Sequence, residues 1–325
     1  MISNSPYNAL PVLVTGGCGF IGSHIAQELI ALGANVTIID DLSTGSMANI
    51  HHIKNHIRFI QATITDQHAC LQATKGQKLI FHLAAQVSVP ESVEKPRLCH
   101  EINVDGTFNI LEAARINKVK RLVLSSSAAV YGNTEELCHE DMPCNPQSPY
   151  GFSKRIGELL CQQYSASYNL ETVILRYFNV YGPRQNTDGA YASARAKFSY
   201  LMKHNMPITI YGDGFQTRDF IHVKEVAQAN LTAGVATIAP GDIFNIASGQ
   251  SITLIELINQ LKEQFPHYDQ KINFAPARPG DLKHSRTDCS KYKSLARQCY
   301  VPAMSNTQGA TLYVPYRHGT KPQQF

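Results

Sequence analysis

The 325-residue chain has little that would point to a membrane, a secretory route or a nucleic acid. No stretch reaches the roughly 18 consecutive apolar residues that a membrane helix needs. Residues 1–10 have neither a charged nor an apolar region typical of a signal peptide, so we expect no secretory signal. The net charge is only +4 and the positive residues are scattered, whereas nucleic-acid-binding proteins normally carry a basic stripe. We therefore expect no membrane and no nucleic acid among the partners.

Metal-binding cysteine patterns are also missing. The eight cysteines form no Cys-x-x-Cys pair and show no Cys/His metal spacing. Several lie in segments that are typical of helix or strand, as reduced thiols of a cytosolic protein do. We expect a cytoplasmic location and no metal site. Hydrophobic residues make up 43% of the chain, enough for the core of one large domain with a smaller one attached.

Apolar runs alternate with helix-like segments over the first two thirds of the chain, and this alternation predicts βαβ units. The runs are short and contain β-branched residues, which is typical of strands buried on both faces of a parallel sheet. We expect an α/β fold with a doubly wound, Rossmann-like parallel sheet. The expected strands are residues 12–15, 36–40, 57–61, 79–83, 121–125 and 172–176, and the expected helices are 21–32, about 103–116 and 154–168.

The alternation breaks after Arg176. Residues 177–216 are rich in Gly, Pro, Asn and Tyr, and regular patterning returns at 219–233 and 243–246. This predicts a second, smaller, mixed α/β domain whose chain crosses back to the sheet. We expect residues 1–176 plus about 219–247 to bind a nucleotide and residues 177–218 plus about 248–325 to bind the substrate. The pocket would lie between them, at the carboxyl ends of the strands.

The first expected strand leads directly into a glycine turn with the spacing G-x-x-G-x-x-G, and a helix follows. Gly16 would make the tight turn and Gly19 would let the backbone approach a pyrophosphate. Gly22 would let helix and strand pack closely. The free N–H groups at the start of the helix can then bind phosphate.

An aspartate closes the second expected strand, about 20 residues after the glycine turn, where a carboxylate takes the hydroxyls of an adenosine ribose. This residue is Asp40, and Asp41 follows it without an arginine that would accept a 2′-phosphate. We therefore expect NAD rather than NADP as the cofactor. The alternative is that Asp40 is only an acidic turn residue.

Three further features follow in chain order: a serine run that ends in Ser127, then Tyr150, then Lys154. The Tyr-x-x-x-Lys spacing places both side chains on one face of a helix, one turn apart. The lysine ammonium and a nicotinamide cation would together lower the tyrosine pKa from about 10 towards neutrality. Ser127 would hydrogen-bond the same substrate hydroxyl, so the group suits proton removal from an alcohol whose carbon gives up a hydride. The alternative for an isolated Tyr-x-x-x-Lys is a polar helix surface.

The sequence also carries a wider set of motifs: the glycine loop, Asp40-Asp41-Leu42-Ser43-Thr44-Gly45, His82-Leu83-Ala84-Ala85, Asn103, Ser125-Ser126-Ser127 with Val130-Tyr131-Gly132, Ser148-Pro149-Tyr150-Gly151, Arg176-Tyr177-Phe178-Asn179, Gly212-Asp213-Gly214, Arg218-Asp219-Phe220 and Arg278-Pro279-Gly280-Asp281. With these motifs, residues 10–295 resemble the extended short-chain dehydrogenase/reductase family and, within it, the UDP-hexose 4-epimerases. The motifs are most similar to those of UDP-N-acetylglucosamine 4-epimerases.

The resemblance implies which residues bind the ligands, with Ser127, Tyr150 and Lys154 as the catalytic group. For NAD they are Gly16, Gly19, Phe20, Ile21, Gly22, Asp40, Asp41, Ser43, Thr44, Gly45, Thr63, Ile64, Leu83, Ala84, Ala85, Asn103, Ser125, Tyr150, Lys154, Tyr177 and Val180. For the UDP-sugar they are Ser88, Ser127, Tyr150, Asn179, Gln185, Ser193, Phe198, Tyr211, Arg218, Arg278, Asp281 and Ser285.

Among these, Asn179, Arg218, Arg278 and Asp281 would hold the UDP portion by the resemblance, since arginines bind a diphosphate bidentately. Tyr177 and the neighbouring Phe178 would pack near the nicotinamide. As aromatic residues after a strand, these two could equally belong to the core.

The two residues after Ser127 separate the reactions of the family. Its dehydratases carry Asp-Glu there and its decarboxylases a Glu, because elimination needs a positioned acid and base. Here the residues are Ala128 and Ala129. The resemblance therefore implies oxidation and re-reduction at one carbon. Tyr150 takes the O4 proton, the 4-keto sugar turns over, and the hydride returns to its other face, so that NAD stays bound.

The choice of sugar is implied by a position shortly after the Arg-Pro-Gly-Asp motif, where a tyrosine restricts the pocket to plain hexoses. This position is Ser285, a small residue that would admit a 2-acetamido group. We expect interconversion of UDP-N-acetylglucosamine and UDP-N-acetylgalactosamine, with UDP-glucose and UDP-galactose as a second pair. Alternatively, Ser285 is a loop residue without this role. A UDP-glucuronate 4-epimerase and a non-catalytic NAD-binding scaffold are the other hypotheses, although scaffolds tend to lose the Tyr or the Lys.

Two segments depart from the family pattern. Ala62-Thr63 replaces Gly-Asp at the end of the third strand, so Thr63 and the backbone of Ile64 would contact the adenine without the usual charge. The run 295–302 and the segment 304–316 match the family's C-terminal pattern poorly, which puts the packing of the small domain in doubt. By family analogy we expect a homodimer formed through the helices near 103–116 and 154–168.

Overall fold

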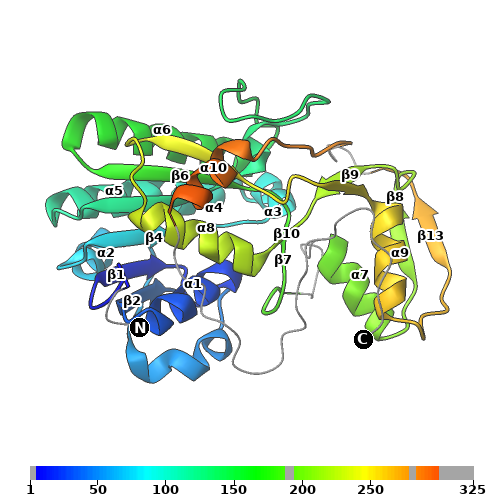
Figure 1. Ribbon diagram of the computed structural model, residues 1–325, viewed down its shortest axis with the longest axis horizontal. Helices are drawn as coiled ribbons and strands as arrows, with labels where there is room; N and C mark the ends of the chain where they lie inside the picture. Colours follow the sequence, from blue (N-terminus) through cyan, green and yellow to red (C-terminus); the bar gives the residue numbers. More distant parts are fainter. Residues whose placement is uncertain (1–4, 187–193, 278–282, 300–325) are drawn as a thin grey trace.

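A computed structural model describes the chain over residues 5–186, 194–277 and 283–299 (Figure 1). Its centre is a seven-stranded, wholly parallel sheet with the strand order β11-β6-β5-β4-β1-β2-β3. The strands are β1 (Pro11–Thr15), β2 (Asn35–Asp40), β3 (Ile57–Gln61), β4 (Leu79–His82), β5 (Arg121–Ser127), β6 (Glu171–Tyr177) and β11 (Asp242–Ile246). The order reverses between β1 and β4, which is the doubly wound topology expected from the sequence.

Side chains of the strands alternate between two apolar layers because successive residues point to opposite faces. Val12, Val14 and Ile38 belong to one buried cluster, whereas Leu13 and Ile39 belong to the other. The first layer is covered by α1 (Phe20–Ala31), α8 (Val223–Val235) and α10 (Ser290–Gln298), and the second by α2 (Gln67–Thr74), α5 (Gly106–Ile116) and α6 (Pro149–Tyr168). Each fully buried aliphatic side chain contributes about 1.5–3 kcal/mol to this packing.

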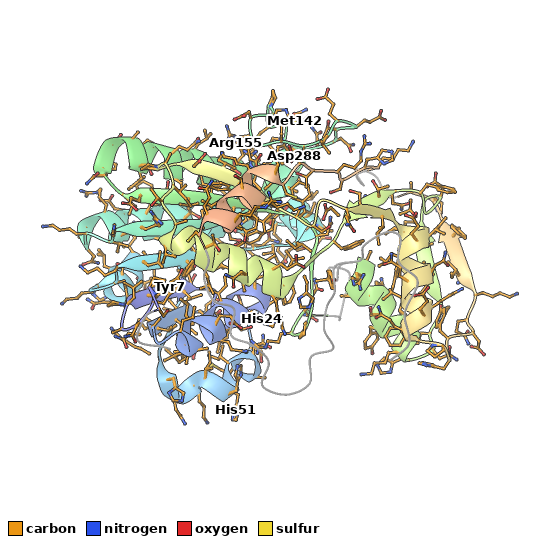
Figure 2. All side chains as sticks on the ribbon, in the orientation of Figure 1. Tyr7, His24, His51, Met142, Arg155 and Asp288 are labelled. Carbon is orange, nitrogen blue, oxygen red and sulfur yellow. The ribbon has the colours of Figure 1, made fainter. Side chains whose placement is uncertain are left out.

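The N-terminal segment is tied into the first layer. Tyr7 is fully buried, and its hydroxyl donates a hydrogen bond to the carbonyl of Leu231 on α8 (Figure 2). Two short helices, α3 (Val89–Glu94) and α4 (Pro96–His100), link β4 to a π-helical turn at Glu101–Asp105 that leads into α5. Short 3₁₀ turns lie at Met47–Asn49, His51–His56 and Ala128–Val130.

A smaller lobe lies beside the sheet and has its own apolar cluster (Figure 1). It contains α7 (Ala194–Lys203), α9 (Leu254–Gln264) and three strand pairs. The pairs are β8 (Ile208–Tyr211) with β13 (Ile272–Ala275), β9 (Thr217–Asp219) with β12 (Ser251–Thr253), and β7 (Val180–Tyr181) with β10 (Ile221–His222). Thr253 and Glu256 form a reciprocal capping box that starts α9. The domain boundaries expected from the sequence remain a prediction.

The Rossmann-like sheet and its crossovers agree with the sequence prediction, including the return of the chain through α8 to β11. Several boundaries differ from the predicted ones by a residue, and two differ by more. β5 continues to Ser127, and α6 begins at Pro149 instead of at residue 154. The earlier start has a local cause, because the Ser148 hydroxyl accepts from the Gly151 N–H and proline suits the first turn of a helix. None of the helices in the described ranges is both long and apolar enough to span a bilayer.

Candidate active site

The glycine turn between β1 and α1 forms a tight backbone cradle. Gly16 has φ +66°, and a Cβ there would lie 2.8 Å from the Ala84 nitrogen. A Cβ on Gly22 would lie 2.2 Å from the Gly16 carbonyl oxygen, so only glycine fits without a shift of the backbone. Gly19 immediately precedes Phe20, the first residue of α1. It has no side chain that could cover the free N–H groups of the first helical turn. This cradle can receive a pyrophosphate at the helix N-terminus.

Asp40 ends β2 beside this cradle, and its carboxylate is buried. Oδ2 accepts from the Cys18 N–H and Oδ1 from the Leu42 N–H, both at 2.9 Å. Burial raises the pKa of Asp40, and these two hydrogen bonds oppose the rise. Each carboxylate oxygen keeps a further lone pair that can accept from a ribose hydroxyl. A Cβ on Gly45 would lie 2.9 Å from Oδ1, which keeps that position small.

The neighbouring acidic and hydroxyl residues are more exposed. Asp41 accepts from the N–H of Ser43, and Ser43 and Thr44 lie at the surface of the loop. At the end of β3, the Thr63 hydroxyl contacts Thr65, whereas the Ile64 side chain is buried against Gly106. The glycine cradle and the buried Asp40 carboxylate together fit the pyrophosphate and ribose of NAD.

The loop after β4 closes the other side of the cradle. The Thr15 hydroxyl accepts from the N–H groups of Leu83 and Ala84 and contacts His82 Nδ1 at 2.7 Å. Burial lowers the pKa of His82 to about 3, so this imidazole is neutral and serves as a fixed bridge between β1, β4 and α5. Leu83, Ala84 and Ala85 therefore run past the glycine turn, where the sequence predicts cofactor contacts.

Asn103 lies in the π-helical turn before α5, and π turns are frequent at functional sites. Its Oδ1 accepts from the Gln86 N–H at 2.8 Å, while Nδ2 donates to the Gln86 carbonyl and to Ser153 Oγ, both at 2.9 Å. The Asn103 amide thus ties the β4 loop to α6. This side chain is committed to protein groups, although the sequence predicts that it contacts the cofactor.

The expected catalytic group comes together where β5 meets α6. Lys154 is buried, and its Nζ donates to the Ser125 carbonyl at 2.9 Å. The same Nζ lies 5.9 Å from the centroid of the Tyr150 ring. Ser127, at the end of β5, hydrogen-bonds the Tyr150 hydroxyl, and its Oγ also accepts from the Ala129 N–H at 3.2 Å. The arrangement brings a phenol, a hydroxyl and an ammonium to the carboxyl end of the sheet.

The protein groups alone do not lower the tyrosine pKa. Burial raises the pKa of Tyr150, and the hydrogen bond from Ser127 opposes this rise. Burial also lowers the pKa of Lys154 to about 8, against the opposing charges of Cys99 and Glu158. The expectation joins Lys154 with the nicotinamide cation, so a lowered tyrosine pKa in the cofactor-bound protein stays a prediction. A phenolate at neutral pH needs the positive charge of the nicotinamide as well.

Hydrogen bonds connect the segments that carry several of the residues expected to bind the substrate. Asn179 donates to the Asp219 carbonyl at 2.9 Å, beside Arg218 on β9. Val180, which is expected at the cofactor, pairs with Ile221, and its carbonyl accepts from the side chain of Gln185, which is expected at the substrate. The carbonyl of Tyr211 accepts from Gln216, two residues before Arg218. The segment of Ser285 runs alongside, since the Ser285 carbonyl accepts from Ser251 and the Lys283 carbonyl from Thr217.

Other residues predicted to contact the ligands are bonded or packed within the protein, and their ligand contacts stay predictions. The Tyr177 ring is buried against α8 and its hydroxyl donates to Asn230, and Phe178 packs on Tyr131. Both side chains are therefore buried, and their packing near the nicotinamide stays a prediction. Phe198 is buried in the apolar cluster of the small lobe. Ser88 caps α3 by accepting from the Glu91 N–H. Ser193, Arg278 and Asp281 lie outside the described residues.

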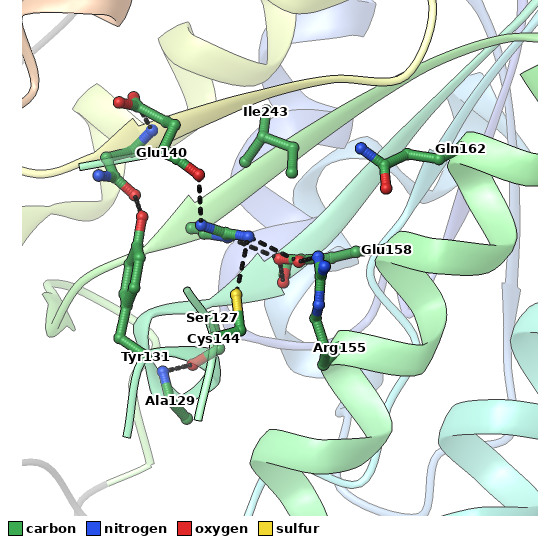
Figure 3. A network of polar contacts seen from close by, with 12 residues as sticks. Ser127, Ala129, Tyr131, Glu140, Cys144, Arg155, Glu158, Gln162 and Ile243 are labelled. Atoms are coloured by element: carbon green, nitrogen blue, oxygen red, sulfur yellow. Dashed lines mark hydrogen bonds and ion pairs between the residues drawn. The ribbon is translucent and has the colours of Figure 1, made fainter. Parts of the chain in front are cut away.

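Sequence reasoning missed a buried ionic network next to the catalytic strand (Figure 3). Glu158 on α6 and Arg176 on β6 form a bidentate ion pair, and Arg155 and Ser126 also contact the carboxylate. A signal was present in the sequence. Arg176 directly follows the apolar run Val173-Ile174-Leu175 in β6, and a fully buried arginine requires a buried acid as partner. Glu158 follows Lys154 by one helical turn.

The glycine cradle, the buried Asp40 and the Ser127, Tyr150 and Lys154 group define a nicotinamide-dependent Rossmann-fold enzyme. Residues 12–247 match the family described as the NAD dependent epimerase/dehydratase family. A protein of Methanocaldococcus jannaschii named putative UDP-glucose 4-epimerase is 40% identical over 287 residues, which cover 87% of this chain and 92% of that protein. The chain belongs to the NAD dependent epimerase/dehydratase family, and NAD is its cofactor as the sequence predicts.

Solved structures agree with this assignment. The UDP-N-acetylglucosamine 4-epimerase of Methanobrevibacter ruminantium, in complex with UDP-N-acetylmuramic acid, is 37% identical with a TM-score of 0.85 and covers 89% of this chain and 92% of its own. The UDP-glucose 4-epimerase of Thermus thermophilus, in complex with NAD, is 35% identical with a TM-score of 0.81 and covers 90% of this chain and 94% of its own.

Proposed function

We propose that the protein inverts C4 of a UDP-sugar by transient oxidation to a 4-keto sugar. The observation that carries this proposal is the group of Ser127, Tyr150 and Lys154, with Ala128 and Ala129 beside it. The elimination that the dehydratases of this family catalyse needs a further acid and base. The side chains of Ala128 and Ala129 supply neither. Oxidation followed by re-reduction at the same carbon remains, and the named relatives are 4-epimerases.

Each side chain has a distinct task in this reaction. NAD, held by the glycine cradle and Asp40, would supply the hydride transfer from C4 and back to it. Tyr150 would take the proton from the O4 hydroxyl, and Ser127, whose hydroxyl lies beside that of Tyr150, would donate a hydrogen bond to the same substrate oxygen. The Lys154 ammonium, fixed by the Ser125 carbonyl, stabilises the phenolate electrostatically. Arg218, with Asn179 and the expected Arg278 and Asp281, would anchor the UDP portion while the sugar turns over.

We further propose UDP-N-acetylglucosamine and UDP-N-acetylgalactosamine as the preferred pair. Ser285 supports this choice because it is small and nearly buried, and its segment runs beside the strand of Arg218. The similar structure from Methanobrevibacter ruminantium is named a UDP-N-acetylglucosamine 4-epimerase. UDP-glucose and UDP-galactose are the second candidate pair, since the Methanocaldococcus relative is named for UDP-glucose.

A product assay tests this proposal. The purified protein is incubated with UDP-N-acetylglucosamine and, in parallel, UDP-glucose, and the C4 epimers are resolved by NMR. We expect conversion of the N-acetylated sugar without net formation of NADH. Conversion of UDP-glucose alone would retain the reaction and reject the sugar preference. Failure with both sugars, followed by conversion of UDP-glucuronate, would establish the alternative epimerase, and failure with all three would favour a non-catalytic scaffold.

Replacing Ser285 with Tyr is expected to damage turnover of the N-acetylated sugar selectively. The larger side chain would fill the space for the 2-acetamido group, so kcat/KM for UDP-N-acetylglucosamine should fall more than about tenfold further than kcat/KM for UDP-glucose. Ser285→Ala is the matched control and should leave both values near those of the wild type. An equal loss on both sugars in Ser285→Tyr would remove this residue as the determinant of specificity.

We also propose a homodimer formed through α5 and α6, in a cytoplasmic protein. These helices pack together, since Phe108 of α5 contacts Tyr164 of α6. Both helices nevertheless expose large apolar side chains: Phe108 and Ile116 on α5, and Phe152 and Leu159 on α6. A second copy of the chain would cover this surface, because monomeric proteins rarely expose contiguous apolar patches of this kind.

Leu159→Asp is expected to weaken the dimer by placing a charge in the apolar contact. Light scattering after size exclusion should show a shift from dimer to monomer at micromolar concentrations. Phe274→Asp, a change of another exposed large apolar residue, in the small lobe, is the control and should leave the dimer intact. An unchanged dimer in Leu159→Asp, or dissociation only in Phe274→Asp, would contradict this interface.

A further inference from the structure

The strongest unassigned feature of the described residues is the ionic network beneath the catalytic strand. Glu158 and Arg176 have side-chain exposures of 0% and 1%, so both charges are removed from water. The contacts from Arg176 Nε to Oε1 and from Nη2 to Oε2 of Glu158 are both 2.8 Å. Two further groups donate hydrogen bonds to the Glu158 carboxylate: Ser126 Oγ at 2.6 Å and Arg155 Nη1 at 2.9 Å.

Arg176 makes further contacts on its other side. Nη1 donates to the Glu140 carbonyl, Nη2 lies 3.3 Å from the Cys144 sulfur, and the guanidinium stacks 4.7 Å from the centroid of the Tyr131 ring (Figure 3). Burial acts to raise the pKa of Glu158, but the hydrogen bonds and charge of Arg176 outweigh it and hold the pKa below its ordinary value. The network is therefore ionised, and several hydrogen bonds hold both of its charged groups.

The position of the network relates it to the catalytic group. Tyr150, Lys154 and Glu158 are spaced by four residues on α6 and so lie on one side of the helix. They contact three consecutive residues of β5: Tyr150 meets Ser127, Lys154 meets the Ser125 carbonyl, and Glu158 meets Ser126. Because strand side chains alternate, Ser126 points to the face opposite Ser125 and Ser127. Ser126 therefore belongs to the network and not to the expected substrate side.

We propose that the Glu158–Arg176 pair is a positioning unit, which holds α6 in one rotation and axial position against β5 and β6 so that Tyr150 and Lys154 meet Ser127 and Ser125. This inference rests on the proposed function, since the positioned groups are those of the proposed epimerase. A buried ion pair stabilises little compared with apolar side chains of similar volume, but it permits few geometries. Misplacement by about 1 Å can cost roughly 10²-fold in rate, so a rigid tie matters for turnover.

Two variants test the proposal. Ser126→Ala keeps both charges and removes only the hydroxyl that links Glu158 to β5. We expect kcat to fall roughly tenfold, with KM for the UDP-sugar, bound NAD and thermal midpoint near wild-type values. The double variant Glu158→Leu with Arg176→Met removes the pair without leaving a buried charge, and we expect a fall of roughly 10²-fold in kcat with the same pattern.

A matched control comes from the opposite ends of the same two strands. Arg121 on β5 and Glu171 on β6 form an ion pair at 2.7 Å, far along the strands from Ser127. Glu171→Gln breaks this pair and should leave kcat unchanged. If Ser126→Ala and the double variant both keep the wild-type kcat, the pair only stabilises the fold and the proposal is wrong. If the double variant does not fold, the kcat of Ser126→Ala alone tests the proposal, and a wild-type value would reject it.

A measurement without substrate separates this inference from the proposed function. The ionisation of Tyr150 can be followed by tyrosinate absorbance in the NAD-bound protein, as the difference between each protein and its Tyr150→Phe derivative. The hydrogen bond from Ser127 lowers the pKa of Tyr150, so its loss in Ser126→Ala should shift this titration to higher pH. An unshifted titration would overturn the positioning role, whereas a wild-type protein that converts no UDP-sugar would overturn only the epimerase proposal.

Discussion

Replacing Tyr150 with Phe is expected to lower kcat by roughly 10²–10⁴-fold, the usual contribution of a general base. The change removes one hydroxyl and keeps the ring, so the packing at the start of α6 should persist. Lys154 would still donate to the Ser125 carbonyl, and the glycine cradle would be untouched. We therefore expect NAD and UDP-sugar to bind as in the wild type, and steady-state kinetics with a measurement of bound NAD checks both expectations.

The matched control for this prediction lies on the same helix. Tyr164 is also on α6, and its hydroxyl donates to Glu112 on α5, away from the carboxyl end of the sheet. Tyr164→Phe should retain the wild-type kcat. A Tyr150→Phe protein that turns over at the wild-type rate would show that another group removes the O4 proton. A protein that has lost NAD would show that Tyr150 holds the cofactor.

Gly22→Ala is expected to have the largest effect on cofactor retention. The added Cβ would lie 2.2 Å from the Gly16 carbonyl oxygen, and both positions are backbone that cannot turn aside as a side chain can. Overpacking of this kind costs about 3 kcal/mol, and here it would separate α1 from the turn that receives the pyrophosphate. We expect the purified variant to contain little NAD and to unfold at a lower temperature than the wild type.

Gly157→Ala provides the comparison because this glycine also lies in a helix. Its added Cβ would meet the nearest atom at 3.6 Å, an ordinary contact, so NAD content should be unchanged and stability should rise by about 0.5–1 kcal/mol. Absorbance of the released cofactor and calorimetry measure the two quantities. Full NAD occupancy in Gly22→Ala would contradict this prediction. It would mean that the backbone of the turn between β1 and α1 can shift to make room for the added Cβ and still bind NAD.

The sheet was predictable because its physical signal is local and repeated. Strands such as β1 and β4 are short, largely apolar runs, and parallel strands buried on both faces leave this pattern in any sequence. The glycine turn was predictable for a similar reason, since a positive φ at Gly16 and a close approach at Gly22 exclude other residues. Tyr150 and Lys154 were found from their spacing on one helix face.

Contacts between distant segments were harder to predict. Glu158 and Arg176 each have a local signal, but their pairing depends on how α6 packs on β6. The side chains of Tyr177 and Phe198 are core residues because neighbouring elements cover them, and no periodicity in their own segments shows this. Asn103 was recognised as important, but its bonds to Gln86 and Ser153 join segments 17 and 50 residues away.

The most direct test of the central claim follows the hydrogen on C4. The protein is incubated in ordinary water with a UDP-sugar that carries deuterium at C4, and the C4 position of the epimerised product is examined by NMR. If the hydride leaves C4 and returns to its other face within one binding event, the product retains the deuterium at C4 and no NADH is released. Replacement of the deuterium by hydrogen from water, or its appearance in free NADH, would contradict the account.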